Sequence, residues 1–140
     1  MFLVDTNVVS EMFKPDPDAR FHAWLVATPR SALMLCSIVV AELQLAIALL
    51  PDGKSRRQLS AAIDGFTAQS HQVLPFGLAE AQAFARIAAD RRRLGKPILE
   101  LDAQIAAIAS TQGASLATRN VRDFEECGVK VINPWEYQAA

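Results

Sequence analysis

Three carboxylates in this chain stand where an acidic side chain is costly unless it has a partner. Asp5 directly follows the apolar run of residues 2–4 and so lies at the end of the first expected strand. Glu42 and Asp102 lie on expected helices, where the residues three, four and seven positions away are mostly apolar. Removing an unpaired carboxylate from water is unfavourable even after the protein relaxes. We therefore expect each of the three to be protonated, paired with a base or bound to a cation.

Each of these acids also has a purely structural interpretation. Asp5 can cap the helix that follows it, because Asp is among the best N-capping residues. Glu42 can pair with an arginine from elsewhere in the fold. Asp102, which lies near the start of its helix, can act as a second cap. Taken one at a time, the three acids leave the choice between structure and function open.

A fourth polar group follows the strand expected at residues 115–117. Its members are Thr118, Arg119, Asn120, Arg122 and Asp123. Asn120 and Asp123 lie just past the carboxyl end of that strand, and functional groups of open parallel sheets collect at such ends. A polar loop that caps the next short helix would explain the same residues structurally.

A metal site follows if the acids meet at one end of the sheet. Carboxylates packed together without compensation raise one another's pKa values, and a divalent cation removes the conflict. Oxygen ligands without a Cys or His cluster select Mg²⁺ or Mn²⁺ over zinc. His22 and His71 have no partner at a metal-binding spacing, and the sequence contains neither a glycine-rich phosphate loop nor a serine nucleophile elbow.

The elements that must position these residues alternate along the chain. Short β-like runs and longer helical patterns follow one another, which predicts an α/β domain with a parallel sheet covered on both faces. We expect strands at 2–4, 33–36, 72–74, 115–117 and 129–132, and helices at 6–13, 18–27, 37–50, 54–69, 78–94 and 101–112. Asp18 and Ser37 are the expected caps of two of these helices.

Length and composition indicate one globular domain over residues 1–140. The chain has 140 residues, of which 51% are hydrophobic and 21% charged, enough for a substantial core. Positive and negative charges nearly cancel, so nucleic-acid binding would depend on local basic patches. We expect a cytoplasmic protein without a secretory leader or membrane span, and with Cys36 and Cys127 as reduced core residues.

Five stretches carry a resemblance to a known family. They are LVDTNVVSE at the start, SIVVAELQLAIAL around Glu42, LDAQIAAIA at Asp102, LATRNVRDF at Asn120 and Asp123, and INPWE near the end. In this order they resemble PIN-domain proteins, and among them the VapC- and FitB-type toxin ribonucleases of type II toxin–antitoxin systems. Each stretch alone is weak evidence, but the five together are specific and span nearly the whole chain.

The resemblance implies a three-layer α/β/α sandwich around a parallel sheet of four to five strands, with RNA cleavage that depends on Mg²⁺ or Mn²⁺. It assigns Asp5, Glu42 and Asp102 to the metal site. The fourth acidic position of the family falls on or near Asn120, so either this amide or Asp123 completes the site. The family also implies a homodimer and a cognate antitoxin of the VapB or FitA type.

Other side chains near the expected site are candidates for contacts with RNA. Thr6 and Thr118 can hydrogen-bond the carboxylates or the scissile phosphate. Arg119 and Arg122 can hold flanking phosphates. Two further basic clusters, at 54–57 and 91–96, are better interpreted as solvated helix faces than as an RNA track.

Two other functions are compatible with the same fold. An aspartyl phosphatase would use Asp5 as its nucleophile, but that chemistry usually needs a second Asp and a Thr where this sequence has Asn7 and Val9. A non-catalytic binding or assembly module would use an apolar helix such as residues 79–89 as its contact surface.

Overall fold

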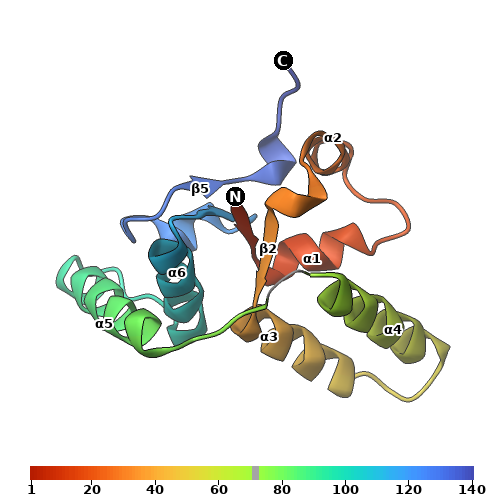
Figure 1. The fold of residues 1–140 in the computed structure, drawn as a ribbon, viewed down its shortest axis with the longest axis horizontal. Helices are drawn as coiled ribbons and strands as arrows, with labels where there is room; N and C mark the ends of the chain where they lie inside the picture. Colours follow the sequence, from red (N-terminus) through yellow and green to blue (C-terminus); the bar gives the residue numbers. More distant parts are fainter. Residues whose placement is uncertain (71–72) are drawn as a thin grey trace.

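A computed structural model describes residues 1–70 and 73–140 of the chain (Figure 1). Its strands are β1 (Phe2–Val4), β2 (Leu33–Cys36), β3 (Val73–Leu74), β4 (Ser115–Ala117) and β5 (Val131–Ile132). Its α-helices are α1 (Thr6–Met12), α2 (Ala19–Ala27), α3 (Ser37–Ala48), α4 (Lys54–Gln69), α5 (Leu78–Arg93) and α6 (Glu100–Gln112). Short 3₁₀ helices, η1 (Arg30–Ala32), η2 (Val121–Phe124) and η3 (Pro134–Glu136), lie in the connections.

The strands form one parallel sheet in the order β3-β2-β1-β4-β5. Leu3 in the central strand β1 lies opposite Met34 of β2 on one side and Leu116 of β4 on the other. The chain builds one half of the sheet outward from β1 and the other half outward from β4. The switch of direction therefore falls between β1 and β4, where open α/β sheets bind their ligands. Asp5 and Thr118 directly follow these two strands.

Helices lie on both faces of the sheet, which confirms the predicted α/β/α arrangement. In Figure 1, α5 and α6 lie side by side on one side of the sheet, α1 and α2 lie on the other, and α3 and α4 form a helical pair below them. Strands β1 and β4 are largely apolar because both of their faces are covered. Leu3, Val4, Leu116 and Ala117 are all inaccessible to solvent.

Most predicted element boundaries lie within two residues of the observed ones. Of the two predicted helix caps, one is observed and one is not. Asp18 is the N-cap of α2, as predicted, and its carboxylate accepts hydrogen bonds from the backbone N–H groups of Arg20 and Phe21. The prediction that Ser37 caps α3 is wrong, because Cys36 holds that position and offers no side-chain bond. Gln72, assigned to the third strand from sequence, lies outside the described residues.

Two further expectations concern the cysteines and the membrane. Cys36 and Cys127 are both buried and free, as predicted. Among residues 1–70 and 73–140, every helix is too short or too polar to cross a bilayer.

A cluster of aromatic side chains joins α2 to the C-terminal segment. Phe21 is fully buried, and its ring centroid lies 5.9 Å from that of Trp24 and 4.8 Å from that of Trp135. Trp24 also meets the ring of Phe2 edge-on at 5.8 Å. Because the C-terminal segment contributes only a short strand and one 3₁₀ turn, these contacts anchor it to the rest of the domain.

Truncation of Phe21 should therefore be costly. We expect Phe21→Ala to lower the free energy of unfolding by about 3–5 kcal/mol, through lost apolar burial and the cavity left behind. Urea unfolding followed by circular dichroism measures the change. Val26→Ala on the same helix is the control, because Val26 is 74% exposed and should change stability by less than about 0.5 kcal/mol. Equal effects of the two substitutions would show that the aromatic cluster does not anchor the segment.

Candidate active site

Asp5 lies at the carboxyl end of the central strand and is only 6% exposed. Its backbone N–H donates to the carbonyl of Ala117 in β4 at 3.0 Å, which fixes it against the neighbouring strand. Asp5 is the N-cap of α1, and its Oδ1 accepts a hydrogen bond from the N–H of Thr6 at 2.8 Å. Its Oδ2 accepts one from the hydroxyl of Thr118 at 2.7 Å. Capping thus accounts for one carboxylate oxygen, while the other is held by a residue from a different strand.

Asn7 connects the ends of β1 and β4. Its Nδ2 lies 3.3 Å from Oγ1 of Thr118 and 3.4 Å from Oδ2 of Asp5, and its Oδ1 accepts from the N–H of Arg119 at 3.2 Å. The hydroxyl of Thr118, which is fully buried, also accepts from the N–H of Asn120 at 3.1 Å. Sequence analysis did not identify Asn7 as a site residue. Its position two residues after Asp5, at the junction of strand and helix, was the available signal.

Glu42 is half-buried on α3 but does not lie on the buried stripe of that helix. The residues that pack into the core are Val39, Leu43 and Ile47. Leu45 and Leu49, which share a helical face with Glu42, are 61% and 77% exposed. The expectation that Glu42 faces the core among apolar neighbours is therefore wrong. Nearly every face of α3 is apolar, so the hydrophobic pattern did not define which face would be covered.

Thr6 nevertheless links Glu42 to Asp5, because it forms a hydrogen bond with each of them. Oε1 of Glu42 accepts a hydrogen bond from the hydroxyl of Thr6 at 3.0 Å, and Thr6 also bonds Asp5 through its backbone.

Asp102 is half-buried in the first turn of α6. It is not the cap, because Leu99 holds the N-cap position. A negative charge in a first turn is favoured by the helix dipole.

The environment of Asp5 and Glu42 opposes their ionisation. Burial raises the pKa of Asp5, and the charge of Asp123 raises it further, whereas hydrogen bonds from Thr118 and Thr6 lower it. Burial also raises the pKa of Glu42, the hydrogen bond from Thr6 lowers it, and the charge of Asp5 raises it. Hydrogen bonds thus offset only part of the cost of charging these carboxylates.

The pKa of Asp102 is raised by burial and by the charges of the other acids. Burial raises its pKa to about 6, with added contributions from the charges of Asp5, Asp123 and Glu42, while the guanidinium of Arg91 lowers it. We call Asp5, Glu42, Asp102 and Asp123 the acid cluster. Asp5 follows β1, the other members come from α3, α6 and η2, and Asp102 lies within electrostatic reach of the other three.

Within the described part of the chain, no salt bridge pairs a base with a member of the acid cluster. The salt bridges there involve the carboxylates of Glu11, Asp52, Asp90 and Glu126. The interpretation of Glu42 as the partner of a distant arginine therefore has no support among these residues. Carboxylate oxygens with excess negative charge form a donor set that suits a hard divalent cation. As they stand, however, no three acidic, Cys or His side chains in residues 1–70 and 73–140 are arranged to hold an ion, so binding would have to draw them closer together.

The loop after β4 places the remaining candidates at the rim of the cluster. Asn120 occupies the N-cap position of η2 without a side-chain capping bond, and both it and Asp123 are exposed. The guanidinium of Arg119 lies 5.2 Å from the centre of the Trp135 ring. A polar cavity of about 520 Å³ opens here, lined by Arg119, Asn120, Val121, Arg122, Asp123, Asn133 and Glu136. Both predicted RNA-binding arginines therefore line a cavity to which the acid cluster contributes Asp123.

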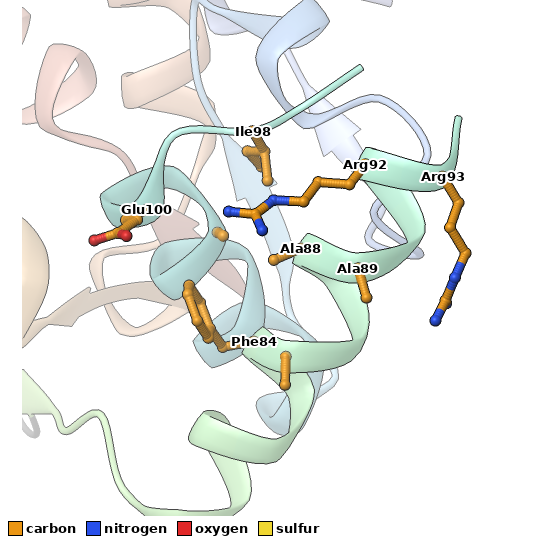
Figure 2. A pocket seen from close by; sticks show the side chains of 9 residues that line it. Phe84, Ala88, Ala89, Arg92, Arg93, Ile98 and Glu100 are labelled. Carbon is orange, nitrogen blue, oxygen red and sulfur yellow. The ribbon is translucent and has the colours of Figure 1, made fainter. Parts of the chain in front are cut away.

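A second cavity, of about 440 Å³, lies between α5 and α6 and contains no member of the acid cluster (Figure 2). Its walls are largely apolar and include Phe84, Ala88 and Ile98. Figure 2 shows Arg92 reaching over this groove and Arg93 pointing away from it. The lining of this cavity offers a single carboxylate, Glu100, whereas the acid cluster brings four together, so we take the acid cluster as the candidate active site.

Comparison with known proteins identifies the family. Residues 2–130 match the PIN domain. The chain belongs to the PIN-domain family. It is 39% identical over 138 residues to the VapC ribonuclease Y4jK of Sinorhizobium fredii, covering 97% of this chain and 99% of that protein. It is also 36% identical over 137 residues to the toxin FitB of Neisseria gonorrhoeae, covering 96% and 99% of the two chains.

Solved structures agree with this assignment. The PIN domain described here superposes on a chain of the FitAB complex bound to an IR36 DNA fragment with a TM-score of 0.90, 35% identity and coverage of 99% of both chains. Within the PIN-domain family, the chain therefore belongs with the VapC and FitB toxins, as the sequence motifs predicted.

The raised pKa of Asp102 predicts how its replacement changes stability with pH. Because the folded value is about 6 and the ordinary value 3.8, the folded protein keeps a proton that the unfolded chain has released between these values. Stability therefore falls as pH rises through this window and stays lower above it. We expect Asp102→Asn to raise the midpoint of urea unfolding at about pH 7.5, with a gain that shrinks toward about pH 4.

Asp90→Asn is the matched control, because Asp90 is exposed on α5 and its salt bridge is with the exposed Arg93. It should show no comparable pH-dependent gain. An Asp102→Asn protein no more stable than the wild type at about pH 7.5 would contradict the assigned repulsion.

Proposed function

We propose that this PIN domain is the ribonuclease toxin of a toxin–antitoxin pair and hydrolyses RNA phosphodiester bonds with the help of Mg²⁺ or Mn²⁺. The observation that carries the metal dependence is the acid cluster, in which Asp5, Glu42 and Asp102 have raised pKa values and no described salt bridge. The ribonuclease class is supported by the similarity to VapC ribonuclease Y4jK.

Asp5 and Asp102 would hold the ion, with Asn120 or Asp123 completing the donor set. A bound divalent ion supplies an activated water and offsets the charge that develops on the phosphate. The hydrogen bonds to both oxygens of Asp5 fix the orientation of its carboxylate before any ion arrives. Buried Thr118 is therefore a positioning residue for Asp5.

Glu42 is the candidate for the group that takes a proton from the attacking water. The hydrogen bond from Thr6 fixes Oε1, so that Oε2 remains for that water. The raised pKa of Glu42 suits a general base, since a base works best when its pKa approaches the working pH. Thr6 thus links the proposed base to the proposed ion ligand Asp5.

Arg119 and Arg122 would bind the phosphates that flank the scissile bond. Both line the polar cavity that Asp123 shares with the acid cluster. Phosphate contacts of this kind position the strand without reading its sequence. RNA binding should consequently weaken as salt concentration rises.

We further propose that the protein acts in the cytoplasm as a homodimer whose activity a cognate antitoxin of the VapB or FitA type restrains. The FitAB complex provides the precedent for such a partner. Two exposed leucines, Leu45 of α3 and Leu49 at its C-cap, provide apolar area for subunit contacts.

No observation favours the two alternative functions. An aspartyl phosphatase usually needs a second Asp and a Thr at positions where this chain has Asn7 and Val9. A purely binding module would have no need for the buried Asp5 and the half-buried Glu42 and Asp102 at one end of the sheet, since none of the three has a described salt-bridge partner.

Neutralisation of a single acid tests the proposal. We expect wild-type protein to cleave total bacterial RNA in Mn²⁺ or Mg²⁺ and to stop in EDTA. Asp5→Asn and Asp102→Asn should each lower the rate by at least about 100-fold while leaving the circular dichroism spectrum unchanged, because each removes charge needed to hold the ion. Asp90→Asn, at an exposed site away from the cluster, should cleave normally. Equal cleavage by the wild type in EDTA, or by folded Asp5→Asn, would overturn the proposal.

A further inference from the structure

Arg91 is a buried cation that lies outside the acid cluster. It occupies the last turn of α5 and is only 5% exposed, whereas Arg92 and Arg93 beside it are exposed. The expectation that the basic cluster at 91–96 forms a solvated helix face is therefore wrong for Arg91. A buried guanidinium is costly unless its donors are bonded, so its partners indicate what its burial achieves.

The partners of Arg91 are backbone carbonyls from two separate loops. Nε donates to the carbonyl of Lys96 at 2.7 Å, and Nη1 donates to the carbonyls of Asp123 at 2.9 Å and Glu125 at 2.8 Å. Nη1 also lies 3.5 Å from Sγ of Cys127. One side chain thus joins the α5–α6 connection to the segment that follows η2.

The segment held by Arg91 contains a strained residue. Glu126 has a φ of 59°, and no other non-glycine residue in the described ranges has a positive φ. A side chain in this left-handed region is unfavourable and persists only where the surroundings hold it. Arg91 bonds the carbonyl of Glu125 just before this residue and approaches the sulfur of Cys127 just after it. The strained turn is therefore held on both sides by one guanidinium.

The same segment carries one side of the candidate active site. The N–H of Asp123 donates to the carbonyl of Asn120 at 3.1 Å, which joins Asp123 of η2 to the N-cap residue of the same turn. The carbonyl of Asp123 accepts from Arg91, while its carboxylate acts on Asp5 and Asp102. Displacement of this backbone would therefore move Asp123 and Asn120 relative to the rest of the acid cluster.

We propose that Arg91 is a positioning residue of the nuclease site, which holds the strained turn at Glu126 and thereby places Asp123 and Asn120 beside Asp5. This inference rests on the proposed function for its effect on cleavage, but not for its effect on the segment itself. The charge of Arg91 also lowers the pKa of Asp102 and so counteracts part of the cluster's repulsion.

The test compares Arg91→Met, Arg91→Lys and Arg93→Met in full-length protein. We expect Arg91→Met to lower kcat about 100-fold, as small displacements of catalytic groups do, with KM changed by less than about threefold. The kcat of Arg91→Lys should be about tenfold higher than that of Arg91→Met, because an ammonium can bond some of the carbonyls but lacks the planar fork of a guanidinium. Arg93→Met, at an exposed neighbour on the same helix, should leave kcat unchanged.

Hydrogen exchange measured by mass spectrometry without RNA provides a second readout. In Arg91→Met, amides of residues 121–128 should exchange at least about tenfold faster, while those in the core of α6 keep their protection. A folded Arg91→Met protein with wild-type kcat, or with unchanged exchange in this segment, would overturn the proposal. If Arg91→Met does not fold, Arg91→Lys decides: a lowered kcat with faster local exchange supports the proposal, and wild-type values of both overturn it.

The two proposals can fail separately. A wild-type protein that cuts no RNA, or that cuts equally well as Asp5→Asn, contradicts the proposed function. The exchange comparison still decides whether Arg91 holds the segment. If the wild type shows normal metal-dependent cleavage and Arg91→Met has the same kcat and the same hydrogen exchange as the wild type, only the role of Arg91 is contradicted.

Discussion

Negative charge without a compensating base is the constraint on which this site depends. The strand order brings the carboxyl ends of β1 and β4 together, and α3, α6 and η2 add carboxylates around them. Hydrogen bonds from Thr6 and Thr118 stabilise Asp5, and the charge of Arg91 offsets part of the repulsion at Asp102. The pKa of Asp102 is nevertheless raised to about 6. Such an arrangement lowers stability near neutral pH unless a cation joins it. The proposed function explains why the fold retains it.

Much of the fold could be predicted from sequence because its signals are local. Apolar runs marked the strands, and Asp18 marked the start of α2. The position of Asp5 could be predicted from its place in the sequence, since a residue directly after a central parallel strand lies at the carboxyl end of the sheet. The orientation of Glu42 could not be predicted, because α3 is apolar on most faces and tertiary packing selected the buried stripe. The ligand roles of Asp5, Glu42, Asp102 and Asn120 remain predictions.

The residues missed by sequence analysis act through contacts between distant parts of the chain. Asn7 bonds groups more than a hundred positions away, at Thr118 and Arg119. Arg91 resembles its exposed neighbours in sequence, and only the closure of two loops around its guanidinium buries it. Both residues hold the backbone that carries the acids, so the geometry of the site depends on polar side chains whose contacts form only when distant parts of the chain come together.

Paramagnetic line broadening by Mn²⁺ tests the central claim most directly. In spectra of ¹⁵N-labelled protein, the account predicts that amides around Asp5, Glu42, Asp102 and Asp123 broaden first at substoichiometric Mn²⁺, and that Asp5→Asn abolishes the effect. Broadening centred on exposed acids such as Asp52, or no selective broadening at all, would contradict a cation site at the end of β1 and β4.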